Sequence, residues 1–166
     1  MQKPLNVSLE YREVEYLGHI VSHEGVKLNT NKMKAIKEWK IPTTINHLRG
    51  FLGLTRYYLK FIKNYGRIVT PLTSLLKKDA FSWTPKATKA FEHLTEAMCQ
   101  APASATPHFT KTFIVECDAS GNEIGAVLMQ YERPIAFESG PIKGKFLHKA
   151  IYVKEMLAIL HALKKW

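Results

Sequence analysis

Val-Glu-Cys-Asp-Ala-Ser-Gly-Asn-Glu-Ile-Gly-Ala-Val-Leu-Met, residues 115–129, is the stretch that decides how the C-terminal part of this chain folds. Two apolar runs flank a short turn that contains glycine, and this pattern predicts a hairpin of two strands. The first strand brings one carboxylate, Asp118, to its end. Working outward, the pattern predicts three strands and then a helix, over Thr112–Asp118, Ile124–Gln130, Pro134–Glu138 and Ala150–Trp166.

A second acid, Glu155, lies inside the predicted C-terminal helix. Its neighbours at helical spacing are apolar or aromatic, which predicts that Glu155 faces the core. A buried carboxylate is normally paired or bound to a metal, and carboxylates are ligands that hard divalent cations prefer. The pair therefore indicates a metal site. Two plainer interpretations remain open: Asp118 can be an Asx-turn residue, and Glu155 can reach solvent from the edge of the apolar stripe.

The N-terminal part of the chain combines a short β-rich region with several helices. Residues 9–28 predict two short strands separated by a turn at His23–Gly25. Capping residues and prolines mark the helices that follow. The predicted helices are Lys32–Trp39 with Asn29 or Thr30 as its cap, Thr43 or Thr44 to about Lys63, Leu72–Lys77 beginning at Pro71, and one that begins at Thr84-Pro85.

Three further features of this region carry expectations. Gly50 and Gly53 lie inside the longest predicted helix, where each costs about 1 kcal/mol relative to alanine, so we expect a close backbone approach there. Tyr57 and Tyr58 can stack on a sugar or base, or they can belong to the core. The segment Ala101–His108 contains prolines and small residues and is the predicted domain boundary.

The charge of the chain is high and uneven. The 166 residues carry a net charge of +10, and Asn31–Arg67 holds nine basic residues against one acid, Glu38. Such a stretch is typical of a polyanion partner, although a solubilising basic face remains an alternative. The apolar fraction of 46% indicates folded cores rather than disorder.

Several classes of protein are excluded by the pattern. No apolar run approaches the ~20 residues of a membrane span, and the N-terminus lacks the apolar region of a secretory signal. Cys99 and Cys117 give neither metal-ligand spacing nor a disulfide framework. We therefore expect an intracellular protein, cytoplasmic or nuclear, with no membrane partner. The sequence does not indicate an oligomeric state.

Short motifs in series resemble one known family. Val14–Ser22, Leu48–Tyr58 and Phe81–Thr84 are similar to the reverse transcriptase of gypsy-type long-terminal-repeat retrotransposons. Four later stretches resemble the start of the RNase H domain in the same Pol polyprotein: Cys117–Ser120, Gly125–Leu128, Pro134–Phe137 and Lys154–Ile159. The order and spacing match over nearly the whole chain. The residues around Phe137–Ser139 and His161–Trp166 look most like plant elements.

The resemblance implies an α+β fold, with a helical thumb-like module followed by a partial RNase H-like α/β domain of three antiparallel strands and a helix. Residues 1–28 would be the end of a reverse transcriptase palm, with the strands that hold the primer. Residues 29–78 would form the thumb-like module, and residues 79–111 a connecting helix and a Pro-containing linker. Residues 112–166 would be the N-terminal half of the RNase H-like domain, truncated.

The resemblance also assigns roles to residues. Asp118 and Glu155 match two catalytic acids of RNase H, an incomplete set, and the implied cofactor is Mg²⁺. The implied partner is an RNA–DNA hybrid or a template–primer duplex, which agrees with the basic excess. The positions expected to bind nucleic acid are Gly18, His19, Lys32, Lys34, Arg49, Arg56, Lys60 and Lys63.

Some of the family's residues have no counterpart in this sequence. The polymerase acids of the family lie in a fingers–palm region upstream, and two of the four RNase H acids lie further downstream. We therefore expect a fragment of a reverse transcriptase and RNase H that by itself lacks both activities. The alternatives are a non-catalytic nucleic-acid-binding module and a degenerate remnant.

Overall fold

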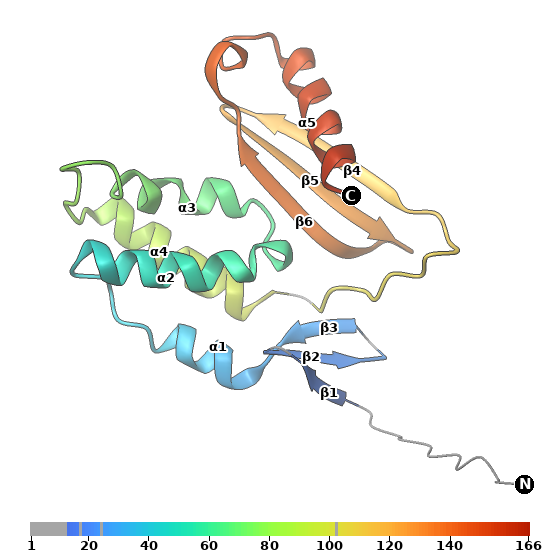
Figure 1. Ribbon diagram of the computed structural model, residues 1–166, viewed down its shortest axis with the longest axis horizontal. Coiled ribbons are helices and arrows are strands. Elements are labelled where there is room, and N and C mark those ends of the chain that lie inside the picture. Colours follow the sequence, from blue (N-terminus) through green and yellow to red (C-terminus); the bar gives the residue numbers. More distant parts are fainter. Residues whose placement is uncertain (1–12, 17, 24, 102) are drawn as a thin grey trace, which may run out of the picture.

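The computed structural model describes residues 13–16, 18–23, 25–101 and 103–166 (Figure 1). Over these residues the chain has an α+β fold with five α-helices and two three-stranded antiparallel sheets, which confirms the predicted fold class. Figure 1 shows α1–α4 and the N-terminal sheet on one side of the molecule and the C-terminal sheet with α5 on the other. The elements are β1 (Glu13–Tyr16), β2 (His19–Ser22), β3 (Gly25–Leu28), α1 (Thr30–Lys37), α2 (Ile45–Tyr57), η1 (Leu59–Phe61), α3 (Tyr65–Ser74), α4 (Pro85–Cys99), β4 (Ile114–Ser120), β5 (Glu123–Gln130), β6 (Arg133–Pro141), η2 (Gly144–Phe146) and α5 (Ile151–Lys165).

The N-terminal sheet has the order β1-β2-β3 and consists of two tight hairpins. Tyr16 pairs with His19, and the turn between them ends at Gly18, whose φ of 78° favours glycine. The prediction of two strands in this region is wrong, because the glycine turn divides the first one. Leu17 and Glu24, which the prediction placed in a strand and a turn, lie outside the described residues.

The segment between α4 and β4 adds a bridge to this sheet. Val26 N donates to the Ser104 carbonyl at 2.8 Å, and Ser104 N donates to the Val26 carbonyl at 2.9 Å. Gly25 leaves the space for this contact, because a Cβ there would lie 2.1 Å from the Ser104 oxygen. The region predicted as a linker is therefore tied to the sheet by its backbone.

Three helices begin where their capping residues predicted. The side chains of Asn29, Thr44 and Thr84 each accept a hydrogen bond from a backbone N–H in the first turn, of α1, α2 and α4 respectively. Pro85 is the first residue of α4, where its missing N–H has no cost. Across the described ranges, we find no helix with the length and apolar character needed to cross a membrane.

α2 ends at Tyr57, and the prediction that it continues to about Lys63 is wrong. The apolar periodicity misled the prediction because Phe61 and Ile62 are buried although the α-helix has ended. A short 3-10 turn, η1, follows α2, and Asn64 then takes the left-handed conformation before α3 begins. The chain therefore keeps its apolar side chains in the core while it changes direction.

α3 contains Pro71 in its interior, where the sequence predicted a helix start. An interior proline loses a backbone hydrogen bond and costs about 3 kcal/mol. Each large apolar side chain that is buried contributes about 1.5–3 kcal/mol, so burial of the apolar face of α3 offsets the cost of the proline. That face consists of Tyr65, Ile68, Val69 and Leu72. The prediction failed because it weighed the proline without the tertiary burial.

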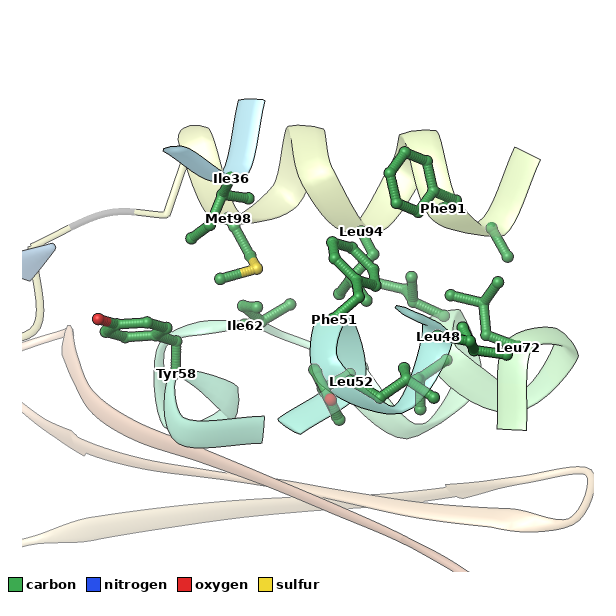
Figure 2. Packing of buried hydrophobic residues seen from close by; sticks show 14 of the residues in the cluster. Ile36, Leu48, Phe51, Leu52, Tyr58, Ile62, Leu72, Phe91, Leu94 and Met98 are labelled. Atoms are coloured by element: carbon green, nitrogen blue, oxygen red, sulfur yellow. The ribbon is translucent and has the colours of Figure 1, made fainter. Parts of the chain in front are cut away.

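The larger core lies between α1, α2, α3 and α4. Figure 2 shows Phe91, Leu94 and Met98 of α4 directed toward α2, which contributes Leu48 and Phe51. The rings of Phe51 and Phe91 lie 4.6 Å apart, at an offset tilt that aromatic pairs favour. This packing holds α2 with one face inward and leaves its other face to solvent.

The C-terminal sheet has the order β4-β5-β6 with antiparallel pairing throughout. α5 covers one of its faces, where Ala158 packs with Ala119 and Ile124. Lys154 Nζ donates to the Gly121 carbonyl at 2.8 Å, which fixes the N-terminal part of α5 next to the β4–β5 turn. The three predicted strands and the final helix are confirmed, and only their ends differ.

The opposite face of this sheet contacts the start of α3. Gly66 N donates to the Ser139 hydroxyl at 2.9 Å, and Thr70 Oγ1 donates to Glu123 Oε1 at 2.8 Å. A Cβ at Gly66 would approach Ser139 Oγ to 3.3 Å, so a glycine lets the helix lie close to the strand. These contacts hold this face of the sheet against α3, opposite the face that α5 covers.

Replacing Gly25 with alanine should destabilise the protein by roughly 3 kcal/mol, because strain at positive φ is joined by a clash with the Ser104 backbone. The matched control is Gly121→Ala. Its φ is also positive, but among the described residues nothing lies within 4 Å of its Cβ, so we expect a loss of only about 1 kcal/mol. Urea unfolding of both variants measures the difference. If both variants lost the same free energy of unfolding, the contact with the Ser104 backbone would add nothing to the cost of the Gly25 substitution.

Candidate functional site

Two predicted nucleic-acid positions, Gly18 and His19, lie where the N-terminal sheet meets the end of α2. A Cβ at Gly18 would lie 3.2 Å from the Tyr58 hydroxyl and 3.8 Å from Cε of Lys32. The Gly18 carbonyl also accepts a hydrogen bond from the Asn29 backbone at 3.1 Å. The turn is therefore held against both α1 and the end of α2.

His19 lies in an aromatic cluster. Its ring stacks on Tyr57, with centroids 5.5 Å apart and planes 16° apart, and it contacts Tyr58 and Phe61 at 5.5 and 5.2 Å. The side chain is buried, and no described residue gives its Nδ1 a hydrogen-bond partner. Desolvation by burial, with a smaller effect of the Lys60 charge, lowers the pKa of His19 below its ordinary value of 6.5. A neutral imidazole therefore supports the Tyr57 ring, which is half exposed.

Six of the seven exposed residues of α2, all except His47, form one face, which we call the α2 stripe: Asn46, Arg49, Gly50, Gly53, Arg56 and Tyr57. Their spacing of three and four residues places them on one side of the helix. Among the described residues, nothing comes within 4 Å of a Cβ at Gly53, and only Trp39 Cζ2, at 4.0 Å, approaches one at Gly50. Within the described residues, the close backbone approach that the sequence predicted at these glycines is not found. The stripe instead presents open backbone between two guanidinium groups.

The other predicted basic residues are arranged differently. Lys60 lies beside the aromatic cluster, with Nζ 5.0 Å from the centre of the Phe61 ring. Lys34 forms an exposed i,i+4 pair with Glu38 at 3.9 Å, which contributes at most a few tenths of a kcal/mol. Lys63 lies beyond η1 and lines hollows beside α3. The structure gathers four predicted positions at the Tyr57 end of the stripe: Gly18, His19, Lys32 and Lys60.

Asp118 faces α3 and not α5. It belongs to one row across the sheet with Gly125 and Ser139, and residues of one row share a face. Ser139 bonds to α3, and a Cβ at Gly125 would lie 3.7 Å from the Asn64 side chain. The exposed Asp118 therefore lines a hollow of about 340 Å³, together with Asn64 and Lys63.

Glu155 is exposed, so the prediction that it faces the core is wrong. α5 is apolar around most of its circumference, and the sheet buries the side that carries Ala158 and Ala162. Exposed apolar residues such as Tyr152 and Ile159 lie beside Glu155 instead. The apolar pattern alone could not show which side the sheet covers.

The two carboxylates come from opposite sides of the C-terminal sheet. Asp118 projects from the side that faces α3, whereas α5, with Glu155, covers the other side, and β4 is an edge strand of its sheet. Within the described ranges, no three His, Cys, Asp or Glu side chains are grouped so that they could hold a metal ion. Because Mg²⁺ needs a near-octahedral set of oxygen ligands, the residues present do not complete a magnesium centre.

Comparison with known proteins gives the family. Residues 83–166 match the family described as "RNase H-like domain found in reverse transcriptase". The chain is 43% identical over 155 residues to the retrovirus-related Pol polyprotein from transposon 297 of Drosophila melanogaster, a match that covers 92% of this chain and 15% of the polyprotein. It is 46% identical over 104 residues to an uncharacterized mitochondrial protein of Arabidopsis thaliana, covering 61% of this chain and 66% of that protein.

Solved structures share the fold. The foamy viral protease-reverse transcriptase in complex with dsDNA has a TM-score of 0.86, and the one in complex with RNA/DNA hybrid has a TM-score of 0.85. Each is 24% identical and covers 93% of this chain, but the chain spans only 34% and 22% of them. The fold and the family match define a reverse transcriptase and RNase H-like region. The chain belongs to the family of RNase H-like domains found in reverse transcriptase, as carried by the Pol polyproteins of retrotransposons.

Replacing His19 with glutamine should reduce the loss of stability on acidification. The unfolded chain protonates His19 near pH 6.5 and the folded chain only at lower pH, so this contribution to stability is present above pH 6.5 and is lost as pH falls through the lowered pKa. Urea unfolding at about pH 7.5 and about pH 5.5 measures the loss. His47→Gln, on the exposed side of α2, should keep the wild-type pH dependence. If the His19 variant lost as much unfolding free energy between these two pH values as the wild type, burial of His19 would not be the cause of the pH dependence.

Proposed function

We propose that this chain is a duplex-holding region of a gypsy-type retrotransposon reverse transcriptase and RNase H. The α2 stripe would contact the backbone of a template–primer duplex or RNA–DNA hybrid. The observation that carries the proposal is the composition of that stripe: two glycines, which no described backbone approaches within 4 Å of a Cβ, lie between two arginines and an exposed tyrosine.

The physical argument starts from the cost of the glycines. Each costs about 1 kcal/mol relative to alanine in an exposed helix interior, and among the described residues only Trp39, at 4.0 Å from a Cβ at Gly50, comes close to either glycine. An external backbone that approaches α2 closely would give the glycines a use. Arg49 and Arg56 can donate forked hydrogen bonds to phosphates on either side, and Tyr57 can stack on a sugar or base.

The residues around the stripe support the same assignment. His19 is packed beneath Tyr57, so it positions that ring and does not itself reach the duplex. Lys32 and Lys60 lie near this end of the stripe and would add attraction for phosphates, and Lys34 would do so more weakly because of its partner Glu38. The foamy viral proteins of the same fold were solved with dsDNA and with an RNA/DNA hybrid, which supports these two partners.

The proposal divides the chain as the family resemblance implies. Residues 1–28 are the end of the palm, 29–78 the thumb-like module, 79–111 the connecting helix and linker, and 112–166 the first part of the RNase H-like domain. The identity to a protein of Arabidopsis thaliana supports a plant-like element. The free thiols of Cys99 and Cys117 support a reducing, intracellular compartment.

Asp118 and Glu155 are, in this proposal, two ligands of a Mg²⁺ centre beside the outer edge of β4. The bond from Lys154 to Gly121 supports this, because it holds the start of α5 next to the end of the strand that carries Asp118. Further acids are needed to complete the centre, so the chain by itself acts as a non-catalytic nucleic-acid-binding module. A degenerate remnant without binding is the alternative.

Gly53→Ala should stabilise the protein by up to about 1 kcal/mol and yet weaken binding to a duplex on the order of tenfold, because the methyl group stands where the backbone would approach. Fluorescence anisotropy with a labelled RNA–DNA hybrid measures the affinity, and urea unfolding measures the stability. Gly121→Ala, in the β4–β5 turn, is the control and should bind as the wild type does. Wild-type affinity in Gly53→Ala would reject the α2 stripe.

The purified chain should not cleave a labelled RNA–DNA hybrid in the presence of Mg²⁺ or Mn²⁺, because two carboxylates do not complete the metal centre. Denaturing gel electrophoresis of the RNA strand detects cleavage, and Asp118→Asn is the control for a contaminating nuclease. Cleavage that this substitution abolishes would reject the non-catalytic assignment. A cooperative thermal transition would exclude the degenerate remnant.

A further inference from the structure

A second group of basic residues lies outside the α2 stripe. α3 and α4 enclose a groove of about 540 Å³, and its basic residues are Lys63, Arg67, Lys86, Lys89 and His93. We infer that this α3–α4 groove binds the phosphate backbone of one nucleic-acid strand. The inference rests on the proposed function, because it takes nucleic acid as the partner, but it assigns a different surface.

Matched spacing on the two helices builds the groove. Its lining residues recur at intervals of three and four residues on each helix, so each set lies on one face. Ile68 of α3 and Ala90 of α4 are buried between the helices and form the floor. The basic side chains are exposed and form the rim. The groove therefore has an apolar base and cationic walls on both sides.

The groove has no acidic side chain among the described residues that line it. None of the five basic side chains forms an ion pair with another described residue. Glu92 and Glu96 of α4 do not line the groove. Arg67 shares a separate small hollow with Asp118 and Glu123. Like charges that converge from two helices repel one another, and a polyanion would relieve that repulsion.

The shape of the groove suits a strand better than a single phosphate. From Lys86 to His93 the helix rises about 10 Å, which corresponds to about three base-pair steps along the axis of a duplex at ~3.4 Å each. Lys63 and Asn64 line both this groove and the hollow over Asp118. A strand bound in the groove would therefore lead toward the carboxylate on β4.

The test compares two double variants that lose the same charge. Lys86→Gln/Lys89→Gln removes two lysines of the groove, and Lys77→Gln/Lys78→Gln removes two exposed lysines that do not line it. The probe is a fluorescein-labelled RNA–DNA hybrid, titrated over a range of salt concentrations. In the groove variant, we expect the slope of log affinity against log salt to fall by about 2 and the affinity to fall on the order of tenfold. The control variant should change much less, and circular dichroism melting should show that both remain folded.

The outcomes separate the groove from the proposed function. Equal losses in the two double variants would overturn the groove, because they would show only general attraction to a basic protein. Wild-type binding by the groove variant, together with weakened binding by Gly53→Ala, would overturn the groove and leave the proposed function standing. Weakened binding by the groove variant, together with wild-type binding by Gly53→Ala, would reject the α2 stripe and support the groove. An absence of binding by the unmodified chain at low salt would reject both.

Discussion

The alternation of side chains across β4, β5 and β6 is the constraint on which the rest of the structure depends. Successive residues of a strand point to opposite faces, so the sheet cannot pack Ala119 under α5 without turning Asp118 toward α3. Gly66 and Ser139 then bring the start of α3 onto that face, and Lys63 comes with it. One apolar contact beneath α5 therefore determines where the carboxylate of β4 lies and which cations lie near it.

α2 shows how one helix can serve both the core and a ligand surface. Its buried face, with Leu48 and Phe51, packs against α4 and contributes several kcal/mol. Its exposed face gives up roughly 2 kcal/mol through Gly50 and Gly53, which the core can offset. α3 and α4 repeat this division, because their apolar residues close the floor of the groove while their basic residues remain at its rim. In the proposed function, stability comes from one side of each helix and nucleic-acid binding from the other.

The sequence predicted an element well where the interactions that form it lie within a few residues of one another. Thr44 and Thr84 marked helix starts because a capping hydrogen bond needs only the next three residues. The hairpin of β4 and β5 was predicted for a similar reason, since turn chemistry and alternation lie within one short stretch. Pro71 misled the prediction because its cost is local whereas the burial that outweighs it comes from neighbouring helices. The bridge to Ser104 had no local signal, because it joins β3 to a residue far away in the chain.

By itself the sequence determined the family and the α+β class, through the order of its motifs and the patterning of its elements, and it singled out Asp118, although the strand that carries Asp118 continues to Ser120. Only the tertiary structure decided that Glu155 is exposed, because α5 is apolar on most sides and the sheet selects which one to bury. Only the tertiary structure, too, brought Arg67 and Lys86 into one groove, since they belong to different helices. The physical reason is the same in both cases. Which side of a helix is buried, and which charges come together, depends on the element that packs against it. That element comes from a distant part of the chain, so the local sequence does not reveal it.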